Sequence, residues 1–226
     1  MRAAGVALAS VLAAWHVPAW AGDAEAVVTL EVSATAVPGQ VPEAMPPRFV
    51  LMGDGTAYVG GTSAVATARL EGGDVKAIEK DIERIRKIPG LASRIDLGPG
   101  SDRSYRIVVR KGKPLDLTAV GDLAGASPAF RPVVSLVNRL ADYGSPDLRP
   151  YHVSSYALSG REETLAGGCR AWTFPVALSQ VLAAPQVVSA SVAETWPTGG
   201  NAASVCAGDK RYVVALRPML PGETRR

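Results

Sequence analysis

The sequence is poor in the side chains that most often carry catalysis or bind metals. Among its 226 residues are two cysteines and two histidines, and aromatic residues make up only 6% of the chain. A structural zinc ion needs four ligands in one place, and beyond residue 21 the one imidazole is that of His152. The glycine pairs match neither a phosphate-binding loop nor a dinucleotide fingerprint. We therefore expect no metal ion and no cofactor.

An excess of charge of one sign is also missing. The chain has 24 Lys and Arg against 21 Asp and Glu, for a formal net charge of +3 at pH 7. A nucleic-acid-binding protein normally has a strong basic excess, so we expect no nucleic-acid partner. Hydrophobic residues make up 47% of the chain and charged residues 20%, which is enough apolar material to bury a core.

The first 21 residues predict export from the cytoplasm. Arg2 precedes an apolar run from Ala3 to Val17, and Ala19-Trp20-Ala21 has the small-x-small pattern that signal peptidase cleaves. Because this run is shorter than the ~20 residues of a spanning helix, we interpret it as a signal peptide and not as a membrane anchor. Cleavage after Ala21 leaves a periplasmic or extracellular protein with no integral membrane segment.

The two cysteines both lie in the part of the chain that is exported. In an oxidising compartment a lone pair typically forms a disulfide, which we predict between Cys169 and Cys206; two free thiols are the alternative. Closing a loop of that length restricts the unfolded chain and stabilises the fold by roughly 4 kcal/mol.

Residues 22–47 predict an N-terminal strand and a linker, and residues 48–143 begin an α+β domain. Val27 to Ser33 alternates apolar and polar residues, and the proline-rich stretch from Val37 to Pro47 follows as an extended linker. Arg48 to Val59 predicts a hairpin closed by a type I′ turn at Asp54-Gly55, with positive φ at both residues. Val65 to Leu70 predicts a further strand.

Two amphipathic helices and a second hairpin complete the domain at residues 48–143. One helix is predicted from Asp74, as its N-cap, to Ile88. A loop from Arg94 to Arg103 leads to the second hairpin, at Ser104 to Arg110 and Pro114 to Val120, and the other helix spans Pro132 to Tyr143. This order predicts an antiparallel sheet built from hairpins, with both helices on one face.

The C-terminal region, residues 144–226, predicts a β-rich portion with less regular structure. The expected strands are Tyr151–Leu158, Cys169–Phe174, Val187-Val188 and Lys210–Arg217, with a short helix at Val176–Ala183 and a loop at Glu194–Asp209. The disulfide would tie one strand to that loop. The sequence leaves open whether this region is a second domain or completes the first.

Few residues offer a basis for catalysis. His152 has Ser154, Ser155 and Ser204 as candidate nucleophile partners, but no Gly-x-Ser-x-Gly elbow surrounds them, and neighbours along a strand point to opposite faces. We therefore assign no catalytic residue and expect a non-enzymatic protein. A hydrolase that uses His152 is an alternative.

A basic cluster on the second hairpin is the candidate binding surface. Its members are Arg103, Arg106, Arg110, Lys111 and Lys113. Such a cluster suits an acidic partner, whereas an ordinary solvated hairpin edge carries similar charges that discourage sheet-to-sheet association. The sequence leaves both interpretations open, and the expected partner is an unspecified protein or peptide.

Two segments resemble those of other exported proteins. Arg48 to Gly55 and Tyr105 to Val109 resemble the Arg-Phe-x-Leu-x-Gly-Asp-Gly hairpin and the Tyr-x-Ile-x-Val strand of uncharacterised exported bacterial proteins and lipoproteins. The order hairpin, helix, hairpin, helix over residues 48–143 is also similar to the emfourin-like inhibitors of bacterial metalloproteases. That resemblance implies a protease inhibitor, but no functional residue is carried over from it. A protease inhibitor is expected to present an exposed, rigid loop, such as Arg94 to Arg103. The residues themselves favour a binding module for a protein or peptide, with the inhibitor as an alternative.

Overall fold

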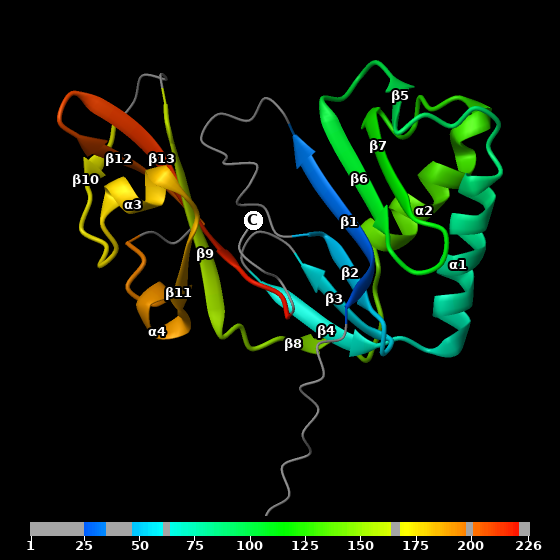
Figure 1. Ribbon diagram of the computed structural model, residues 1–226, viewed down its shortest axis with the longest axis horizontal. Helices are drawn as coiled ribbons and strands as arrows, with labels where there is room; N and C mark the ends of the chain where they lie inside the picture. The colour runs from blue at the N-terminus through cyan, green and yellow to red at the C-terminus, as the bar shows by residue number, and fades with distance from the viewer. Residues whose placement is uncertain (1–24, 35–46, 61–63, 164–167, 198–200, 222–226) are drawn as a thin grey trace, which may run out of the picture.

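The computed structural model describes residues 25–34, 47–60, 64–163, 168–197 and 201–221 (Figure 1). Within these residues the chain forms two β-sheets and four α-helices, so the α+β class predicted from the sequence is confirmed. The predicted signal peptide, and all but the last residue of the linker predicted at 37–47, lie outside the described residues.

Eight strands form the larger sheet, in the spatial order β5-β7-β6-β1-β2-β3-β4-β8. These strands are β1 (Ala26–Ala34), β2 (Phe49–Met52), β3 (Thr56–Gly60), β4 (Val65–Arg69), β5 (Arg94–Gly98), β6 (Arg103–Val109), β7 (Leu115–Gly121) and β8 (Arg149–Pro150). All neighbours run antiparallel except β5 and β7, which are parallel. β1 lies in the middle, where Thr29 is opposite Val50 of β2 on one side and Val108 of β6 on the other.

The first predicted hairpin forms, but with a different turn. β2 and β3 are joined by three residues, and the Gly55 amide donates to the Met52 carbonyl oxygen at 3.0 Å. Gly55 has a φ of +88°, and among the described residues every positive φ belongs to a glycine, so the type I′ turn predicted at Asp54 is wrong. Asp54 instead accepts hydrogen bonds from the backbone N–H and the hydroxyl of Thr56. Three-residue hairpin loops normally need only one left-handed residue, and Gly55 supplies it.

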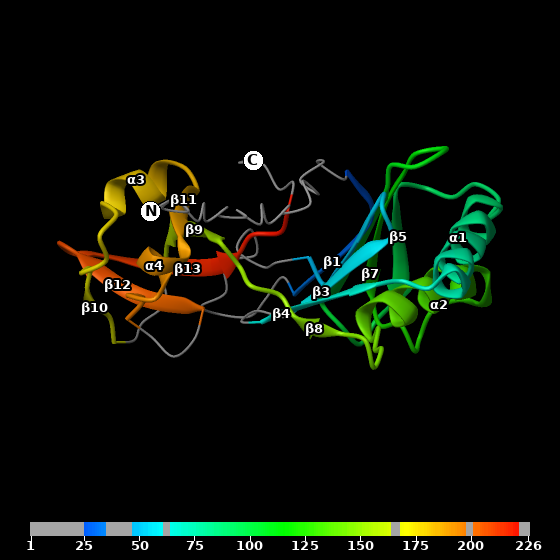
Figure 2. The ribbon, with the colours of Figure 1, turned by 90° about the horizontal axis from the view of Figure 1, so that it is seen from below.

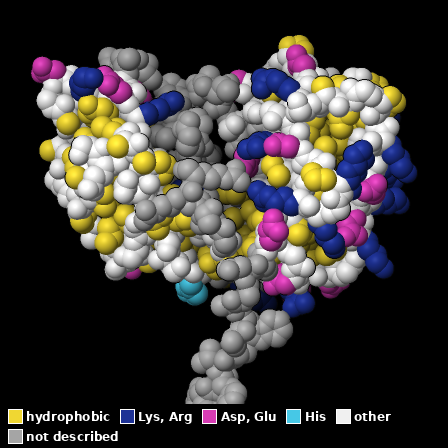
Figure 3. All heavy atoms as spheres, viewed as in Figure 1, with side chains coloured by type: hydrophobic (Ala, Val, Ile, Leu, Met, Phe, Trp, Pro, Cys, Tyr) yellow, Lys and Arg dark blue, Asp and Glu magenta, His cyan; other side chains and the backbone are white. Residues whose placement is uncertain are grey.

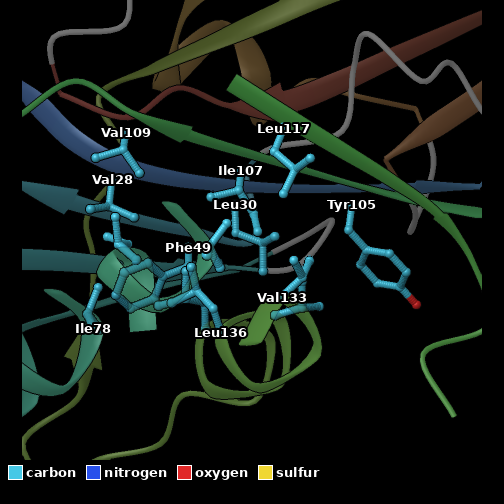
Figure 4. Close-up of a cluster of buried hydrophobic side chains, with 14 of the residues drawn as sticks. Val28, Leu30, Phe49, Ile78, Tyr105, Ile107, Val109, Leu117, Val133 and Leu136 are labelled. Carbon is cyan, nitrogen blue, oxygen red and sulfur yellow. The ribbon is translucent and has the colours of Figure 1, made fainter. Parts of the chain in front are cut away.

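Both longer helices pack on the same face of the larger sheet (Figures 1 and 2). α1 spans Gly72–Arg86, and α2 spans Arg131–Ala141 after a short 3-10 turn at Pro128–Phe130. Their apolar stripes meet the inward-facing side chains of the strands in one core (Figure 4). Fully buried members of this core include Leu30, Phe49, Ile78, Ile107, Leu117, Val133 and Leu136.

The predicted start of the first helix is wrong by two residues. α1 begins at Gly72, with Glu71 at the N-cap position and no side-chain hydrogen bond to the first turn. Asp74 lies inside that turn, and its Oδ2 accepts a hydrogen bond from the Tyr143 hydroxyl at 3.1 Å. The carboxylate that was expected to cap α1 therefore contacts Tyr143, two residues beyond the end of α2.

The loop predicted from Arg94 to Arg103 is largely a strand. β5 occupies its first half, with Ile95 and Leu97 buried and Arg94 and Asp96 exposed, so the connecting loop is confined to residues 99–102. The alternation of buried and exposed residues is that of a strand with one face on the core. The glycines and the proline at the end of this segment are typical of a loop, so the short alternating pattern before them was not interpreted as a strand.

Five strands form the second sheet, in the order β10-β12-β13-β9-β11. These strands are β9 (Ser155–Glu162), β10 (Arg170–Ala171), β11 (Gln186–Ser189), β12 (Ala202–Ala207) and β13 (Lys210–Pro218). The short helices α3 (Leu178–Ala183) and α4 (Ala190–Ala193) share a second apolar core with them. The rings of Trp172, Phe174 and Trp196 pack together in this core, with centroids 5.4 to 6.3 Å apart. We call β1–β8 with α1 and α2 the first lobe, and β9–β13 with α3 and α4 the second lobe.

The second lobe is more regular than the sequence predicts. The loop expected at Glu194–Asp209 contains β12, which pairs with β13 over its whole length. The strand expected at Tyr151–Leu158 is shifted, because β9 begins at Ser155 and ends at Glu162. β12 consists mainly of small residues, and only Ala203 and Val205 are buried. Its sequence therefore shows only a weak alternation of apolar and polar residues, which does not predict a strand.

The predicted disulfide is confirmed. It joins Cys169 to Cys206, whose Cα atoms are 5.5 Å apart. Cys206 lies in β12, and Cys169 directly precedes β10, which runs parallel to β12. The bond therefore holds an edge strand of only two residues against a longer strand.

The connection from β8 to β9 and the residues after β13 link the two lobes. β8 pairs with β4, and the Tyr151 amide donates to the Val65 carbonyl oxygen at 2.8 Å. The rings of Tyr58 and Tyr151 meet edge to face with centroids 5.0 Å apart. Beyond β13, Leu220 is 7% exposed and packs against Val50 and Val65 on the face of the larger sheet that α1 and α2 leave uncovered.

Candidate functional site

The outer edge of β11 presents main-chain groups that have no partner strand. β11 pairs with β9 on one side only, in a register without a bulge. The Ala190 amide donates to the Ser154 carbonyl oxygen at 3.1 Å. This bond shows which residues of β11 are hydrogen-bonded to β9. Because hydrogen-bonded positions alternate along an antiparallel pair, the N–H and C=O groups of Val187 point away from β9. The N–H of Ser189 points the same way, whereas its C=O begins α4, of which Ser189 is the N-cap. Within the described part of the chain, no further strand of the sheet pairs with this side of β11.

The other edge strands are shorter or charged. β8 and β10 have two residues each, and both contain an arginine. β5 exposes Arg94 and Asp96, and the Asp96 carboxylate accepts a hydrogen bond from the Gly98 amide at the end of the strand. Charged side chains on an edge discourage the addition of another strand. β11, with the sequence Gln-Val-Val-Ser, has no such charge.

A pocket of about 290 Å³ lies beside β11. Val187 contributes the β11 wall, and Tyr151, Ser154 and Ser155 contribute the wall that leads into β9. Residues 219–221, which follow β13, close the remaining side, and the Met219 amide donates to the Ser155 carbonyl oxygen at 2.9 Å. Burial raises the pKa of Tyr151 above its ordinary value, so this wall favours the neutral phenol. The lining is therefore mixed, because the hydroxyl-bearing Tyr151, Ser154 and Ser155 face the apolar side chains of Val187 and residues 219–221.

The surface of the second lobe exposes many apolar side chains. On the face that Figure 3 shows, hydrophobic side chains gather over the second lobe, whereas Lys, Arg, Asp and Glu are concentrated over the first lobe. An exposed apolar region next to an open strand edge is a common feature of peptide-binding surfaces.

His152 lies on the surface, between β8 and β9. Its side chain is exposed, and in the described residues it has no hydrogen bond to a serine. Ser204 is in β12, where its hydroxyl lies 3.4 Å from Arg211. The structure therefore does not bring His152 and Ser204 together. Among the described residues, no group of three or more His, Cys, Asp and Glu side chains is arranged to hold a metal ion.

The five basic residues of the second hairpin do not form one patch. Arg106 makes a bidentate hydrogen-bonded pair with Asp116, at 3.0 and 2.8 Å. This pairing is the main reason that the pKa of Arg106 is raised. Lys111 is 3.6 Å from Glu79, and Arg110 donates to a backbone oxygen of β1. Arg103 is at the opposite end of β6 from Lys111 and Lys113, which lie beyond the other end of that strand.

The sequence did not reveal the pocket beside β11, for a specific reason. Val187-Val188 was predicted as a strand, but nothing in those residues indicates that it lies at an edge. The last strand predicted from the sequence ends at Arg217, yet Met219 and Leu220, which follow it, line the pocket. Only the pairing of β13 with β9, far apart in the chain, brings the three walls together.

Comparisons of the chain with protein-family models, with curated proteins and with solved structures give no match. Among the described residues, no helix is long and apolar enough to cross a membrane.

Proposed function

We propose that this protein is an exported, non-enzymatic binding module that takes up an extended peptide segment along the outer edge of β11. The single observation that carries this proposal is the uncharged edge of β11, with the outward N–H and C=O groups of Val187, directly beside a pocket that Val187 also lines. In strand addition, main-chain hydrogen bonds supply affinity and side-chain pockets supply selectivity.

The pocket defines the kind of peptide that would fit. Side chains of an added strand alternate between the two faces of the sheet, so every second residue would point to the face on which Val187 lies. A volume of about 290 Å³ accommodates an aliphatic or aromatic side chain. We therefore expect the bound segment to carry an apolar residue at the position that faces Val187 and Tyr151, and no charge there.

The predicted export and the disulfide support this proposal. A partner strand adds most readily to an edge that is already ordered, because less conformational entropy is then lost on binding. The bond between Cys169 and Cys206 constrains the second sheet in an oxidising compartment. The β11 edge belongs to that same five-stranded sheet.

The test is selection from a random peptide library on the immobilised full-length protein, followed by affinity measurements on two variants. V187P removes an outward N–H that β9 does not use, at a type of position where edge strands tolerate proline. V187T keeps that N–H and changes only the side chain. We expect the enriched peptides to have apolar residues at alternate positions, and V187P to weaken their binding by about tenfold or more.

The comparison between the two variants decides the outcome. V187T should retain most of the affinity, since the main-chain hydrogen bonds remain. Enriched peptides that bind V187P as tightly as the unchanged protein would exclude the β11 edge. Failure of the library to yield any peptide with alternating apolar residues would exclude strand addition itself. Thermal unfolding of V187P serves as the check that the second lobe is still folded.

A further inference from the structure

A second, polar cavity lies in the first lobe, at the end of the larger sheet where β5 and β7 finish. Its volume is about 620 Å³. The start of β6 and the face of α2 form two of its walls, and the loops at 99–102 and 122–124 form the rim. It shares no lining residue with the pocket beside β11. Whatever it binds is therefore independent of the proposed peptide site.

The Tyr105 hydroxyl is the feature that indicates a ligand. Tyr105 is only 5% exposed, and its ring is part of the core of the first lobe. Figure 4 shows the hydroxyl directed away from the apolar cluster formed by residues such as Ile107 and Leu117. Tyr105 lines the cavity, and no hydrogen bond from a described residue reaches its hydroxyl. The hydroxyl is not one of the buried polar atoms that lack a partner among the described residues, so it meets solvent in the cavity. A bound molecule can take the place of that water as its hydrogen-bond partner.

Four further polar side chains surround the same space. The Ser101 Oγ accepts from the Arg103 amide at 3.1 Å, which leaves its O–H free to donate. Asp122 uses Oδ1 to accept from the Ala124 amide at 3.0 Å, which leaves Oδ2 as an acceptor. The Asn138 side chain on α2 is exposed, and neither it nor the Arg103 guanidinium makes a hydrogen bond to a described side chain.

Glycine keeps the rim of the cavity open. Gly100 has a φ of +113°, which L side chains rarely adopt. A Cβ atom at that position would lie 3.5 Å from the Asp122 Oδ2. A side chain larger than hydrogen would therefore occupy the space beside the free carboxylate oxygen.

The charges and hydrogen-bonding groups define the class of ligand. Arg103 and Asp122 contribute one positive and one negative charge, so the lining has no net preference for an anion or a cation. The side chains of Ser101, Tyr105 and Asn138 are each both donor and acceptor, as is an alcohol hydroxyl. Carboxylate and guanidinium groups bind two adjacent hydroxyls through paired hydrogen bonds, and Leu123 and Val134 supply apolar contact for C–H faces.

We infer that this cavity binds a neutral, polyhydroxylated molecule, namely a saccharide unit, with the Tyr105 hydroxyl as a hydrogen-bonding partner. The cavity is large enough for a ring of this kind and is open to solvent, as a hydrated ligand requires. The ligand would replace solvent at the Tyr105 hydroxyl.

The test is amide NMR of the full-length protein, titrated separately with D-glucose, N-acetyl-D-glucosamine and trehalose. We expect at least one of these sugars to shift resonances confined to residues 100–105, 122–124 and 134–138. Y105F removes only the hydroxyl and should weaken that binding by about fivefold or more. S104A, a change on the neighbouring residue of β6 that does not line the cavity, is the matched control and should leave the affinity unchanged.

Two charged probes, L-glutamate and inorganic phosphate, complete the experiment. If either shifts the same resonances at least as strongly as every sugar, the class of ligand is wrong. If none of the three sugars shifts them, or if Y105F binds as well as the unchanged protein, the inference fails. Because the peptide selection reads out a different lobe, its result does not affect this one.

Discussion

Arg139 on α2 donates through its Nε to Oδ2 of Asp81 on α1 at 2.9 Å, across the interface between the two helices. Asp81 is 1% exposed, and its other carboxylate oxygen accepts from Arg84 at 3.0 Å. A carboxylate thus lies among the isoleucines that hold α1 on the sheet. The apolar stripe predicts which face of α1 is buried, but the electrostatic contact with α2 depends on a residue inside that face.

Removing both arginines is expected to destabilise the first lobe. The R84A/R139A variant leaves the buried Asp81 carboxylate without a cation, and we expect a loss of about 3 kcal/mol in the free energy of unfolding. The matched control is R84A/R139A/D81L, which also removes the stranded charge and should recover most of that loss. Urea unfolding followed by circular dichroism measures both. A triple variant no more stable than the double variant would contradict this explanation.

Loss of the disulfide is expected to weaken the second lobe selectively. The two cysteines are 37 residues apart in sequence, so removing the cross-link in C169A/C206A should lower stability by about 4 kcal/mol on the loop-entropy model. The two described tryptophans, Trp172 and Trp196, both pack in the second core, so their emission reports its unfolding. Amide exchange of β6 is the control and should change little. Equal loss of protection in both lobes would show that they unfold as one unit.

The junction between the lobes is expected to loosen in alkali. Burial, together with the nearby Tyr151 and Asp54, raises the pKa of Tyr58 above its ordinary 10.0, and burial also raises that of Tyr151. The folded state therefore favours neutral phenols, while the unfolded chain ionises at the ordinary pKa. This contribution to stability is complete below pH 10.0 and is lost as the pH rises above it.

Urea midpoints measured between about pH 9 and about pH 11 test this sign. They should fall as the pH rises, and Y58F/Y151F should show a shallower fall. Tyr143 provides a comparison, because burial and its hydrogen bond to Asp74 raise its pKa as well. Y143F should therefore reduce the slope separately. A slope that Y58F/Y151F leaves unchanged would place the alkaline sensitivity elsewhere in the chain.

Two glycine-to-alanine substitutions are expected to differ sharply. Gly121 and Gly208 both have positive φ, at +116° and +60°, so alanine is strained at either position. A Cβ at residue 121 would overlap the Gly98 carbonyl oxygen, whereas nothing lies within 4 Å of one at residue 208. We expect G208A to cost about 1 kcal/mol and G121A about 3 kcal/mol or more. Thermal unfolding of the two variants side by side measures the difference, and similar melting temperatures would contradict it.

Local patterns in the sequence predicted the larger sheet and its helices well. The isoleucine spacing located α1, and the alternation around Tyr105 located β6, because each pattern depends on one face meeting a core. The disulfide was also predictable, because the prediction needed only two cysteines and an oxidising compartment. In each case the signal lies within a short stretch of chain.

The features that the sequence did not predict all depend on residues that are distant in the chain. β12 is built from small residues, and its strand character comes from pairing with β13 rather than from its own side chains. From the sequence alone Asp81 is one of several charged residues on α1, and only the packing of α2 against α1 shows that it is buried. The Tyr105 hydroxyl reads as part of an alternating strand, and only the loops at 99–102 and 122–124 show that it borders a cavity.

The middle position of β1 has a consequence for how the protein is made. Ala26–Ala34 is the earliest described strand to be synthesised, yet its two neighbours are β2 and, much later, β6 at Arg103–Val109. A chain that grows from its N-terminus must therefore carry Val28 and Leu30 with one unpaired edge until residue 109 has appeared. If synthesis or export of residues 35–109 is delayed, one edge of β1 stays unpaired and can pair with another molecule. The long separation between β1 and β6 therefore exposes the unfinished chain to aggregation.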